Sequence, residues 1–166
     1  MSESSRLAIC PGSFDPLTNG HLDMVERATR LFDRVVVAVL SNSAKTPFFT
    51  ADERVSMIRE ALVRVPRVEV DTFGGLLAEY VRARGAVAVV RGLRTEGEFS
   101  DELPSALMNR HLFADFETVF LIPSVNVAHI SSRLVRDVAE LGGSLDGLVP
   151  PVVAQRFSAK NGTRRV

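Results

Sequence analysis

The chain has 166 residues, of which 46% are hydrophobic, and its 20 basic side chains balance its 20 acidic ones. This length fits one domain, and the composition is that of a globular protein with a sizeable core, which excludes a disordered or fibrous chain. Zero formal charge provides no overall field toward nucleic acid or lipid headgroups, and no apolar run approaches the roughly 18 residues of a membrane span, so we expect neither nucleic acid nor membrane as a partner.

Five short β-rich runs alternate for most of the chain with patterns of helical period. The runs cover residues 7–10, 35–40, 68–73, 86–90 and 118–122, and the helical patterns fall at residues 22–32, 55–65 and 76–81. The apolar character of the runs indicates strands buried on both faces. Alternation of this kind predicts an α/β fold: a single doubly wound domain with a five-stranded parallel sheet and helices on both faces. We expect the strand order 3-2-1-4-5.

Capping motifs mark several helix boundaries. Residues 50–53 and 95–98 have the Thr-x-x-Glu pattern of a capping box, and residues 131–132 are serines that can cap a helix ended by the glycines at 142–143. Pro104 lies inside a predicted helix over residues 96–113, where it removes a hydrogen bond and crowds the preceding turn. We therefore expect a kink or restart at Pro104.

We assign residues 1–157 to the domain and residues 158–166 to a polar, basic tail that we expect to be disordered. The single Cys10 cannot form an intrachain disulfide, and the first residues lack the basic start and apolar core of a secretory signal. We therefore expect a cytoplasmic protein.

The richest candidate site is the segment 11–21, between the first strand and the first helix. At such a junction free N–H groups and the positive helix end attract anions, and Gly12 and Gly20 allow close approach to a phosphate. Ser13 adds a hydroxyl and His21 a ring donor. The alternative is an ordinary turn with a histidine at the helix start.

Two further clusters follow later strands and should reach the same sheet edge. Arg91 and Arg94 follow the fourth strand and can bind a polyphosphate, although a solvated arginine pair is the alternative. Residues 130–136, with Ser131 and Ser132, follow the fifth strand and can hold phosphate, while Ser131 can equally be a simple N-cap. Lys45 is a fourth cation for this edge, or else a solvent-exposed loop lysine.

Several catalytic motifs are missing from the sequence. It has no Walker A sequence, Gly-x-Gly-x-x-Gly, His-Glu-x-x-His, cysteine pair or nucleophile elbow. P-loop hydrolysis, dinucleotide redox chemistry, structural zinc and serine nucleophile chemistry therefore lose their usual signatures. We interpret His111 as a helix-surface residue and His129 as a loop residue.

Taken together, these segments resemble the nucleotidyltransferase superfamily with a T/H-x-G-H signature, and more closely the bacterial phosphopantetheine adenylyltransferase family. The resemblance is carried by residues 11–21, 45–54, 91–94, 108–111 and 130–136. It implies transfer of the adenylyl group from ATP to 4′-phosphopantetheine, which gives dephospho-coenzyme A and pyrophosphate in the penultimate step of coenzyme A synthesis. It also implies a homohexamer, and coenzyme A or dephospho-coenzyme A as product or inhibitor.

The resemblance also implies roles for individual residues. ATP would contact Ser13, Phe14, His21, Gly92, Leu93, Arg94, Glu102, Val127, Ala128, His129, Ile130, Ser131, Ser132 and Arg133, and phosphopantetheine would contact Ser13, Lys45, Leu77, Arg91 and Asn109. Catalysis would rest on His21, Lys45, Arg91 and Arg94, with Mg²⁺ as cofactor held by the ATP phosphates and by no protein ligand.

The substrates suggest the mechanism. A phosphate monoester has its second pKa near about 6, so phosphopantetheine is anionic at neutral pH and can attack the α-phosphorus without a general base or covalent intermediate. The cations and Mg²⁺ would align two repelling anions and stabilise the charge that develops. Three departures from the family pattern, at Arg133, Asp137 and Pro104, leave the contacts around them open.

Two other functions remain open from the sequence. A nucleotide-sensing module would bind ATP without turnover, although it has no use for a second anion site. Another adenylyl or cytidylyl transfer, to nicotinamide mononucleotide or a polyol phosphate, would share the Thr-Asn-Gly-His element.

Overall fold

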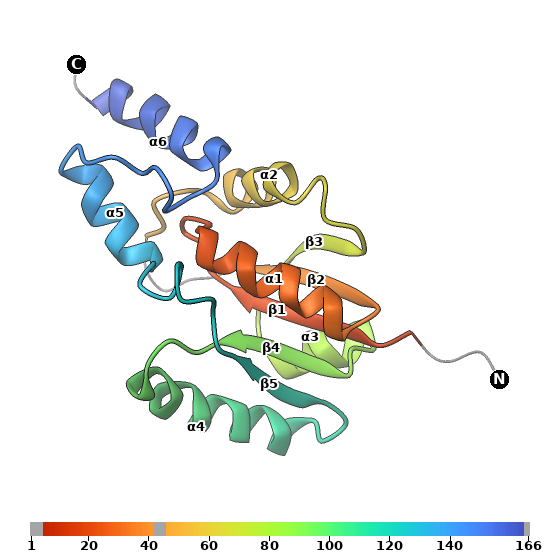
Figure 1. Ribbon diagram of the computed structural model, residues 1–166. Coiled ribbons are helices and arrows are strands. Elements are labelled where there is room, and N and C mark those ends of the chain that lie inside the picture. Colours follow the sequence, from red (N-terminus) through yellow and green to blue (C-terminus); the bar gives the residue numbers. More distant parts are fainter. Residues whose placement is uncertain (1–4, 42–45, 165–166) are drawn as a thin grey trace.

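The structure is a computed structural model that describes residues 5–41 and 46–164. Strands and helices alternate from β1 to β5, and two more helices follow (Figure 1). The elements are β1 (Leu7–Gly12), α1 (Asn19–Leu31), β2 (Arg34–Leu40), α2 (Ala51–Ala61), β3 (Val68–Phe73), α3 (Leu77–Arg84), β4 (Ala88–Gly92), α4 (Glu96–Leu112), β5 (Glu117–Leu121), α5 (Ser132–Glu140) and α6 (Pro151–Arg164).

The strands form one parallel sheet in the order β3-β2-β1-β4-β5, which confirms the predicted topology. β1 pairs with β2 along its whole length, from Leu7 opposite Arg34 to Gly12 opposite Val39. On its other side β1 pairs with β4, so the chain winds outward from β1 in both directions. The carboxyl end of β1 is therefore the point where ligands of open α/β sheets bind.

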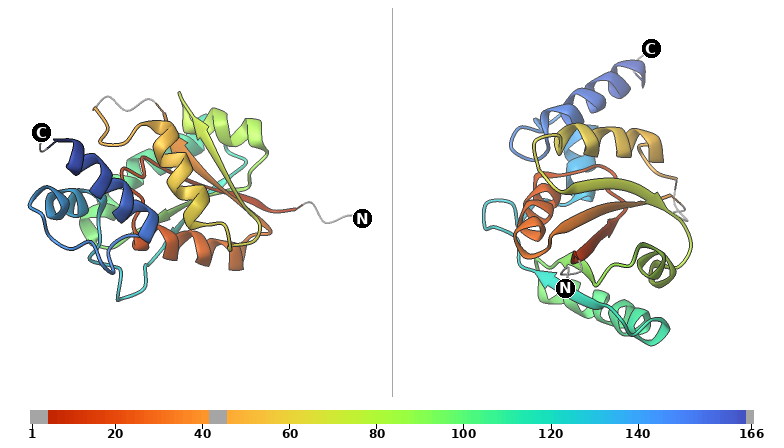
Figure 2. Two further views of the ribbon diagram at one scale, coloured as in Figure 1. Left: turned by 90° about the horizontal axis from the view of Figure 1, so that it is seen from above. Right: turned by 90° about the vertical axis from the view of Figure 1, so that its right-hand side faces the viewer.

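Helices cover both faces of the sheet, as the two turned views in Figure 2 show, and each face has its own core. Ala8 and Cys10 of β1 pack into a cluster with α1, α2, α5 and α6, while Leu7 and Ile9 pack into a cluster with α3. This division follows from the alternation of side chains along a strand. β1 and β2 are buried, but the edge strands β3 and β5 are largely half-exposed, so burial on both faces was wrong for these two.

Helix α4 contains Pro104 and is nevertheless unbroken from Glu96 to Leu112, so the expected restart is wrong, while the expected kink stays a prediction. Proline removes the hydrogen bond to the carbonyl four residues earlier, here that of Ser100. Both Pro104 and Ser100 are exposed, so water can solvate that carbonyl. One lost bond on an exposed face does not end a helix of 17 residues.

Helix α6 runs to Arg164, past the domain boundary expected at residue 157. Phe157 packs against Phe48 and Phe49, and the Lys160 ammonium donates to the Phe48 carbonyl over 2.9 Å. Burial of these rings fixes the helix on α2 and the segment before it. Residues 165–166 lie outside the described residues. Among the described helices, none combines the length and the apolar character needed to cross a membrane.

Candidate functional site

Two cavities adjoin at the carboxyl edge of the sheet. The first, of about 440 Å³, lies between the β1–α1 loop, the start of α4 and the start of α5; the second, of about 600 Å³, lies between the ends of β1 and β2, α3 and α4. Their shared lining consists of Pro11, Gly12, Ser13, Arg91 and Glu102. A ligand in one cavity can therefore meet a ligand in the other at these residues.

The loop after β1 takes a tight path around a buried aromatic ring. Phe14 has a positive φ of 48°, unusual for a residue with a side chain. Its ring lies so close to Gly12 that a Cβ there would approach it to 3.0 Å, which explains the glycine. The ring also meets the His21 imidazole edge to face, with centroids 5.0 Å apart. The loop thus holds Ser13 at the junction of the cavities.

His21 lies in the first turn of α1 and completes a capping box with Thr18, a motif that the sequence analysis missed. The Thr18 hydroxyl accepts from the His21 backbone N–H, and the Thr18 N–H donates to His21 Nδ1 over 3.1 Å. Because Nδ1 accepts, the proton of the neutral ring is on Nε2. Burial, aided by Arg94 and Arg91, lowers the pKa of His21 to about 4. At neutral pH the side chain is therefore an uncharged donor in the wall of the first cavity.

Two arginines from the end of β4 and the loop after it are held in place by acidic residues of α4. Arg91 Nε donates to Glu102 over 2.8 Å in a two-pronged ion pair, and its Nη1 donates to the Pro11 carbonyl over 2.9 Å. Arg94 pairs with Glu98 and donates to the Ile130 carbonyl over 2.9 Å. Burial raises the pKa of Glu98, but hydrogen bonds from Arg94 outweigh it and lower that pKa overall. Both guanidiniums line the first cavity.

The start of α5 closes the first cavity. Ser131 caps the helix by accepting from the Leu134 N–H over 3.2 Å, which confirms its structural role, and it also lines the cavity. Ser132 donates to the Pro16 carbonyl over 2.8 Å and so ties α5 to the β1–α1 loop. The N-cap role of Ser131 is confirmed, while phosphate binding by Ser131 stays a prediction that its place in the cavity wall allows.

The sequence-predicted residues divide by where they lie. Those that line a cavity are Ser13, Phe14, Leu77, Arg91, Gly92, Arg94, Glu102, Asn109, Val127, Ile130, Ser131, Ser132, Arg133 and His21. Leu93, Ala128 and His129 line neither cavity, and His129 is exposed, as is His111 on α4. Lys45 lies outside the described residues.

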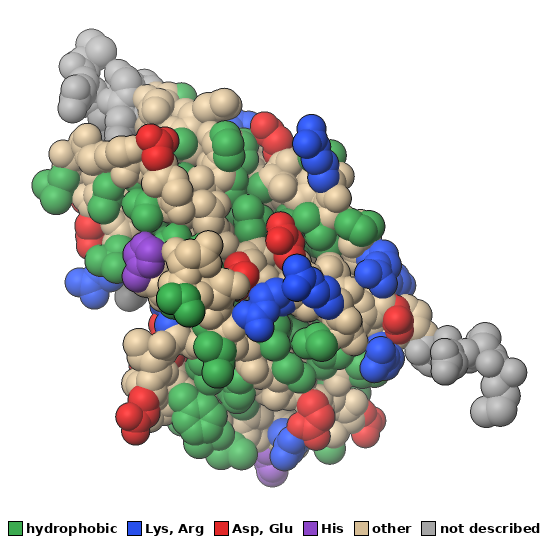
Figure 3. Space-filling view, viewed as in Figure 1, with side chains coloured by type: hydrophobic (Ala, Val, Ile, Leu, Met, Phe, Trp, Pro, Cys, Tyr) green, Lys and Arg blue, Asp and Glu red, His purple; other side chains and the backbone are tan. Residues whose placement is uncertain are grey.

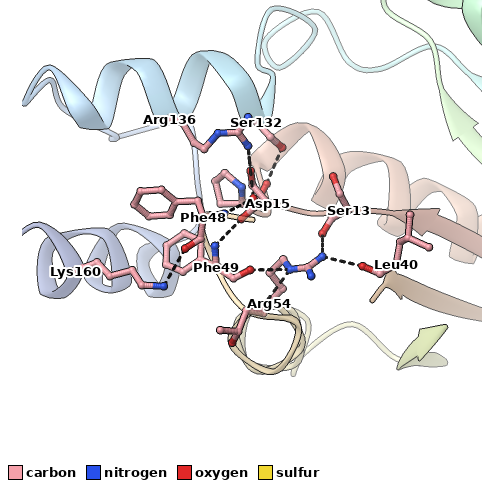
Figure 4. Close-up of polar contacts among 11 residues, drawn as sticks. Ser13, Asp15, Leu40, Phe48, Phe49, Arg54, Ser132, Arg136 and Lys160 are labelled. Atoms are coloured by element: carbon pink, nitrogen blue, oxygen red, sulfur yellow. Dashed lines mark hydrogen bonds and ion pairs between the residues drawn. The ribbon is translucent and has the colours of Figure 1, made fainter. Parts of the chain in front are cut away.

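Supporting residues escaped the sequence analysis because their types are common. The Asp15 carboxylate accepts from the N–H groups of Phe48 and Phe49 over 2.7 and 2.9 Å, and Arg136 bonds to the Asp15 carbonyl (Figure 4). Arg54 is buried and donates a hydrogen bond to the Ser13 carbonyl of the same loop. The one available signal was that Arg54 shares a helical face with apolar Ile58, four residues later.

Comparison with known proteins adds to this geometry. The cytidylyltransferase-like family model matches residues 9–138, which include every cavity-lining residue. A phosphopantetheine adenylyltransferase of Anaeromyxobacter dehalogenans is 51% identical over 158 residues, with 95% of this chain and 96% of the relative covered. One of Thiobacillus denitrificans is 52% identical over 153 residues, with 92% and 96% covered, and one of Geotalea daltonii is 48% identical over 155, with 93% and 96% covered.

The chain belongs to the phosphopantetheine adenylyltransferase family. The family model ends at residue 138, within α5, whereas the full-length relatives align with nearly the whole chain. Membership in the phosphopantetheine adenylyltransferases therefore extends to α6, the helix that the sequence analysis had cut at residue 157.

Proposed function

We propose that this protein transfers the adenylyl group of ATP to 4′-phosphopantetheine and releases dephospho-coenzyme A and pyrophosphate, in the penultimate step of coenzyme A synthesis. The observation that carries the proposal is the meeting of two cavities at Ser13 and Arg91 in a chain of this family. A transfer between two anions needs two such sites with a cationic junction.

ATP is assigned to the first cavity, because it holds Arg94, the start of α5 and His21 near the N-terminus of α1. Phosphopantetheine is assigned to the second, whose lining is largely apolar and includes Leu77 and Asn109. In that arrangement the acceptor phosphate lies at Arg91, on the side facing the ATP phosphates. Lys45 is proposed as a further cation for the acceptor, as the resemblance implies.

The reaction is a single displacement. An oxygen of the acceptor phosphate forms a bond to the α-phosphorus of ATP, and the bond from that phosphorus to the β-bridging oxygen breaks, with the electron pair leaving on pyrophosphate. No proton has to be removed from the acceptor and no enzyme residue is modified. The side chains of this protein align the two phosphates and screen their charge.

His21 and the arginines differ in what they supply. The neutral imidazole offers one hydrogen bond from Nε2 to a phosphate oxygen and keeps its Nδ1 contact to Thr18 throughout. Arg91 and Arg94 supply charge, and their carboxylate partners Glu102 and Glu98 fix where that charge lies. Interactions that strengthen as charge develops on the α-phosphoryl group lower the barrier.

Mg²⁺ is proposed as cofactor, and the donor set in the cavity suits a metal carried by the substrate. In the described part of the chain no three His, Cys, Asp or Glu side chains gather into a metal site. Four carboxylates line the first cavity: Glu98 and Glu102 pair with arginines, Asp23 accepts from Ser124, and Asp101 is the one left unpaired among the described residues. When bound to the ATP phosphates, Mg²⁺ would neutralise charge on the departing pyrophosphate.

We also propose a cytoplasmic homohexamer with coenzyme A or dephospho-coenzyme A as a bound product or inhibitor. Large apolar side chains are exposed along α4, at Phe99, Leu103, Leu107, Met108 and Leu112. Hydrophobic side chains also gather over α4 and β5 in Figure 3. Contact with further copies of the chain would remove such surface from water.

The test is pyrophosphate release from ATP with a panel of acceptors. We expect turnover with 4′-phosphopantetheine and little with nicotinamide mononucleotide or glycerol 3-phosphate. Faster turnover with nicotinamide mononucleotide would assign a different transfer to the same fold, and ATP binding without release for any acceptor would indicate a sensor.

A further inference from the structure

Arg54 is the largest fully buried side chain among the described residues, with 1% of its surface exposed. It projects from the first turn of α2 toward the β1–α1 loop (Figure 4). A cation is rarely buried unless it is paired or fully hydrogen-bonded. Its placement therefore requires a structural or functional reason.

The Arg54 guanidinium joins three segments of the chain through their backbone carbonyls. Its Nη1 donates to the Ser13 carbonyl over 2.6 Å and to the Leu40 carbonyl, at the end of β2, over 3.1 Å. Its Nε donates to the Phe49 carbonyl over 3.1 Å, and the Thr50 carbonyl lies 3.3 Å away. One planar group thus fixes the end of β2 and the start of α2 relative to the loop at the cavity junction.

The contact to the Ser13 carbonyl sets the direction of the next N–H group. The Ser13 carbonyl and the Phe14 N–H belong to one trans peptide unit, in which the two groups point in opposite directions. With the carbonyl turned toward Arg54, the Phe14 N–H points away from it. Among the described residues no carbonyl accepts from this N–H. Phe14 and Ser13 both line the first cavity, so the group is a donor available to a phosphate oxygen.

The residue next to the held carbonyl, Phe14, has a strained backbone conformation. The φ of 48° at Phe14 is a left-handed value, which costs a residue with a side chain about 1 kcal/mol or more. Rotation of the Ser13–Phe14 peptide would relieve this strain and remove the N–H from its direction. The hydrogen bond from Arg54 opposes that rotation.

We propose that Arg54 is a positioning residue for adenylyl transfer: by holding the Ser13 carbonyl, it directs the Phe14 N–H at the phosphate that meets the junction of the two cavities. The inference rests on the proposed function. Arg54 itself lines neither cavity and acts through the loop. Its positive charge, whose partners in the described residues are neutral carbonyls, adds attraction for phosphate from beneath.

The test compares Arg54→Lys and Arg54→Met with Arg59→Met, an exposed arginine of the same helix that donates to the Val70 carbonyl. Lysine keeps the charge but lacks the planar fork that reaches three segments. We expect both Arg54 variants to lower kcat on the order of 100-fold with smaller changes in KM. We expect Arg59→Met to stay within about twofold of wild type.

A second readout separates positioning from a lower folded fraction. The two diastereomers of ATP with sulfur at one α-phosphate oxygen report the geometry around that phosphate, and their rate ratio is independent of how much protein is folded. The ratio should change in Arg54→Lys and stay constant in Arg59→Met. Folded Arg54 variants with the wild-type ratio and kcat would overturn the proposal. Failure of both Arg54 variants to fold would do so too, because Arg54 would then act on folding alone.

A binding measurement keeps this inference distinct from the proposed function. In protein labelled with nitrogen-15 at phenylalanine, inorganic pyrophosphate should shift the Phe14 amide resonance of wild type and Arg59→Met but leave that of Arg54→Lys unmoved. If wild type makes no dephospho-coenzyme A yet shows this pattern, the function fails and the role of Arg54 stands. Equal shifts in all three proteins would overturn the role of Arg54 whatever the reaction.

Discussion

His21 combines two roles that single-residue patterns cannot separate. Its Nδ1 satisfies the Thr18 N–H at the start of α1, and its remaining ring nitrogen belongs to the wall of the first cavity. The sequence analysis weighed a phosphate contact against a plain helix-start histidine. The capping box shows that the structural role exists, and the cavity position supports the chemical one.

Replacement of His21 should therefore affect stability and turnover separately. We predict that His21→Ala lowers turnover on the order of 100 to 1,000-fold, as is typical of losing a preorganised donor. The lost capping contact should also reduce the free energy of unfolding by about 1 kcal/mol. Glutamine at the same position can restore the capping box, so His21→Gln should recover the stability and not the turnover. Thermal unfolding and turnover on the same preparations decide, and near-wild-type turnover per folded His21→Ala molecule would end the catalytic role.

The pH dependence of turnover should come from protonation of the substrate phosphate and not from an enzyme side chain. The pKa of His21 is lowered to about 4, so its ring stays neutral through the usual assay range and is protonated only as the pH falls below that value. The acceptor phosphate takes up a proton near about pH 6. We predict an acid limb near pH 6 in kcat/KM for phosphopantetheine, unchanged in His21→Gln. An acid limb that shifts with this substitution would show that the histidine is the titrating group.

The free energy of unfolding should decrease as the pH falls from 6.5 toward 4, because of the shifted pKa of His21. Its pKa is about 4 when folded and 6.5 in the unfolded reference, so the unfolded chain binds more protons between these values. The contribution of His21 is complete above pH 6.5 and is lost as the pH falls toward 4.

At the scale of elements, helix α4 contains a proline in its interior, and the cost of that proline to stability can be measured. Pro104 forfeits the hydrogen bond to the Ser100 carbonyl at an exposed position of an unbroken helix. Pro104→Ala should restore that bond and raise the free energy of unfolding by up to about 3 kcal/mol. Urea denaturation measures the change, with Ser105→Ala as the neighbouring control. A destabilised Pro104→Ala would mean that proline at this position supports the helix.

The elements also show what could be predicted and why. The parallel sheet and the gathering of the three loops at one edge could be predicted from the alternation of strands and helices, because carboxyl ends of parallel strands share an edge. The burial of Arg54 could not be predicted from the sequence. Its partners are backbone carbonyls of distant segments, and because every residue type has such a carbonyl, no sequence pattern identifies them. The last turns of α6 were not predicted, because the residues after Phe157 are polar and basic. The helix is held by packing of Phe157 against Phe48 and Phe49, a contact between distant segments that the sequence does not reveal.

At the scale of the molecule, the exposed apolar side chains of α4 bear on assembly. Leu107 and Met108 are each 57% exposed, and no residue of α4 is buried. We predict a particle of about six times the monomer mass of 18.1 kDa by light scattering. Leu107→Asp should reduce that mass if this face is covered by another copy. A wild-type mass of 18.1 kDa would refute the hexamer.

The central claim is that the two adjoining cavities bring ATP and 4′-phosphopantetheine together for direct adenylyl transfer. The measurement that tests it most directly is simultaneous quantification of dephospho-coenzyme A, pyrophosphate and AMP from these two substrates with Mg²⁺. The account predicts that dephospho-coenzyme A and pyrophosphate form in equal amounts with no AMP. Release of AMP without dephospho-coenzyme A, or no dependence on phosphopantetheine, would contradict it.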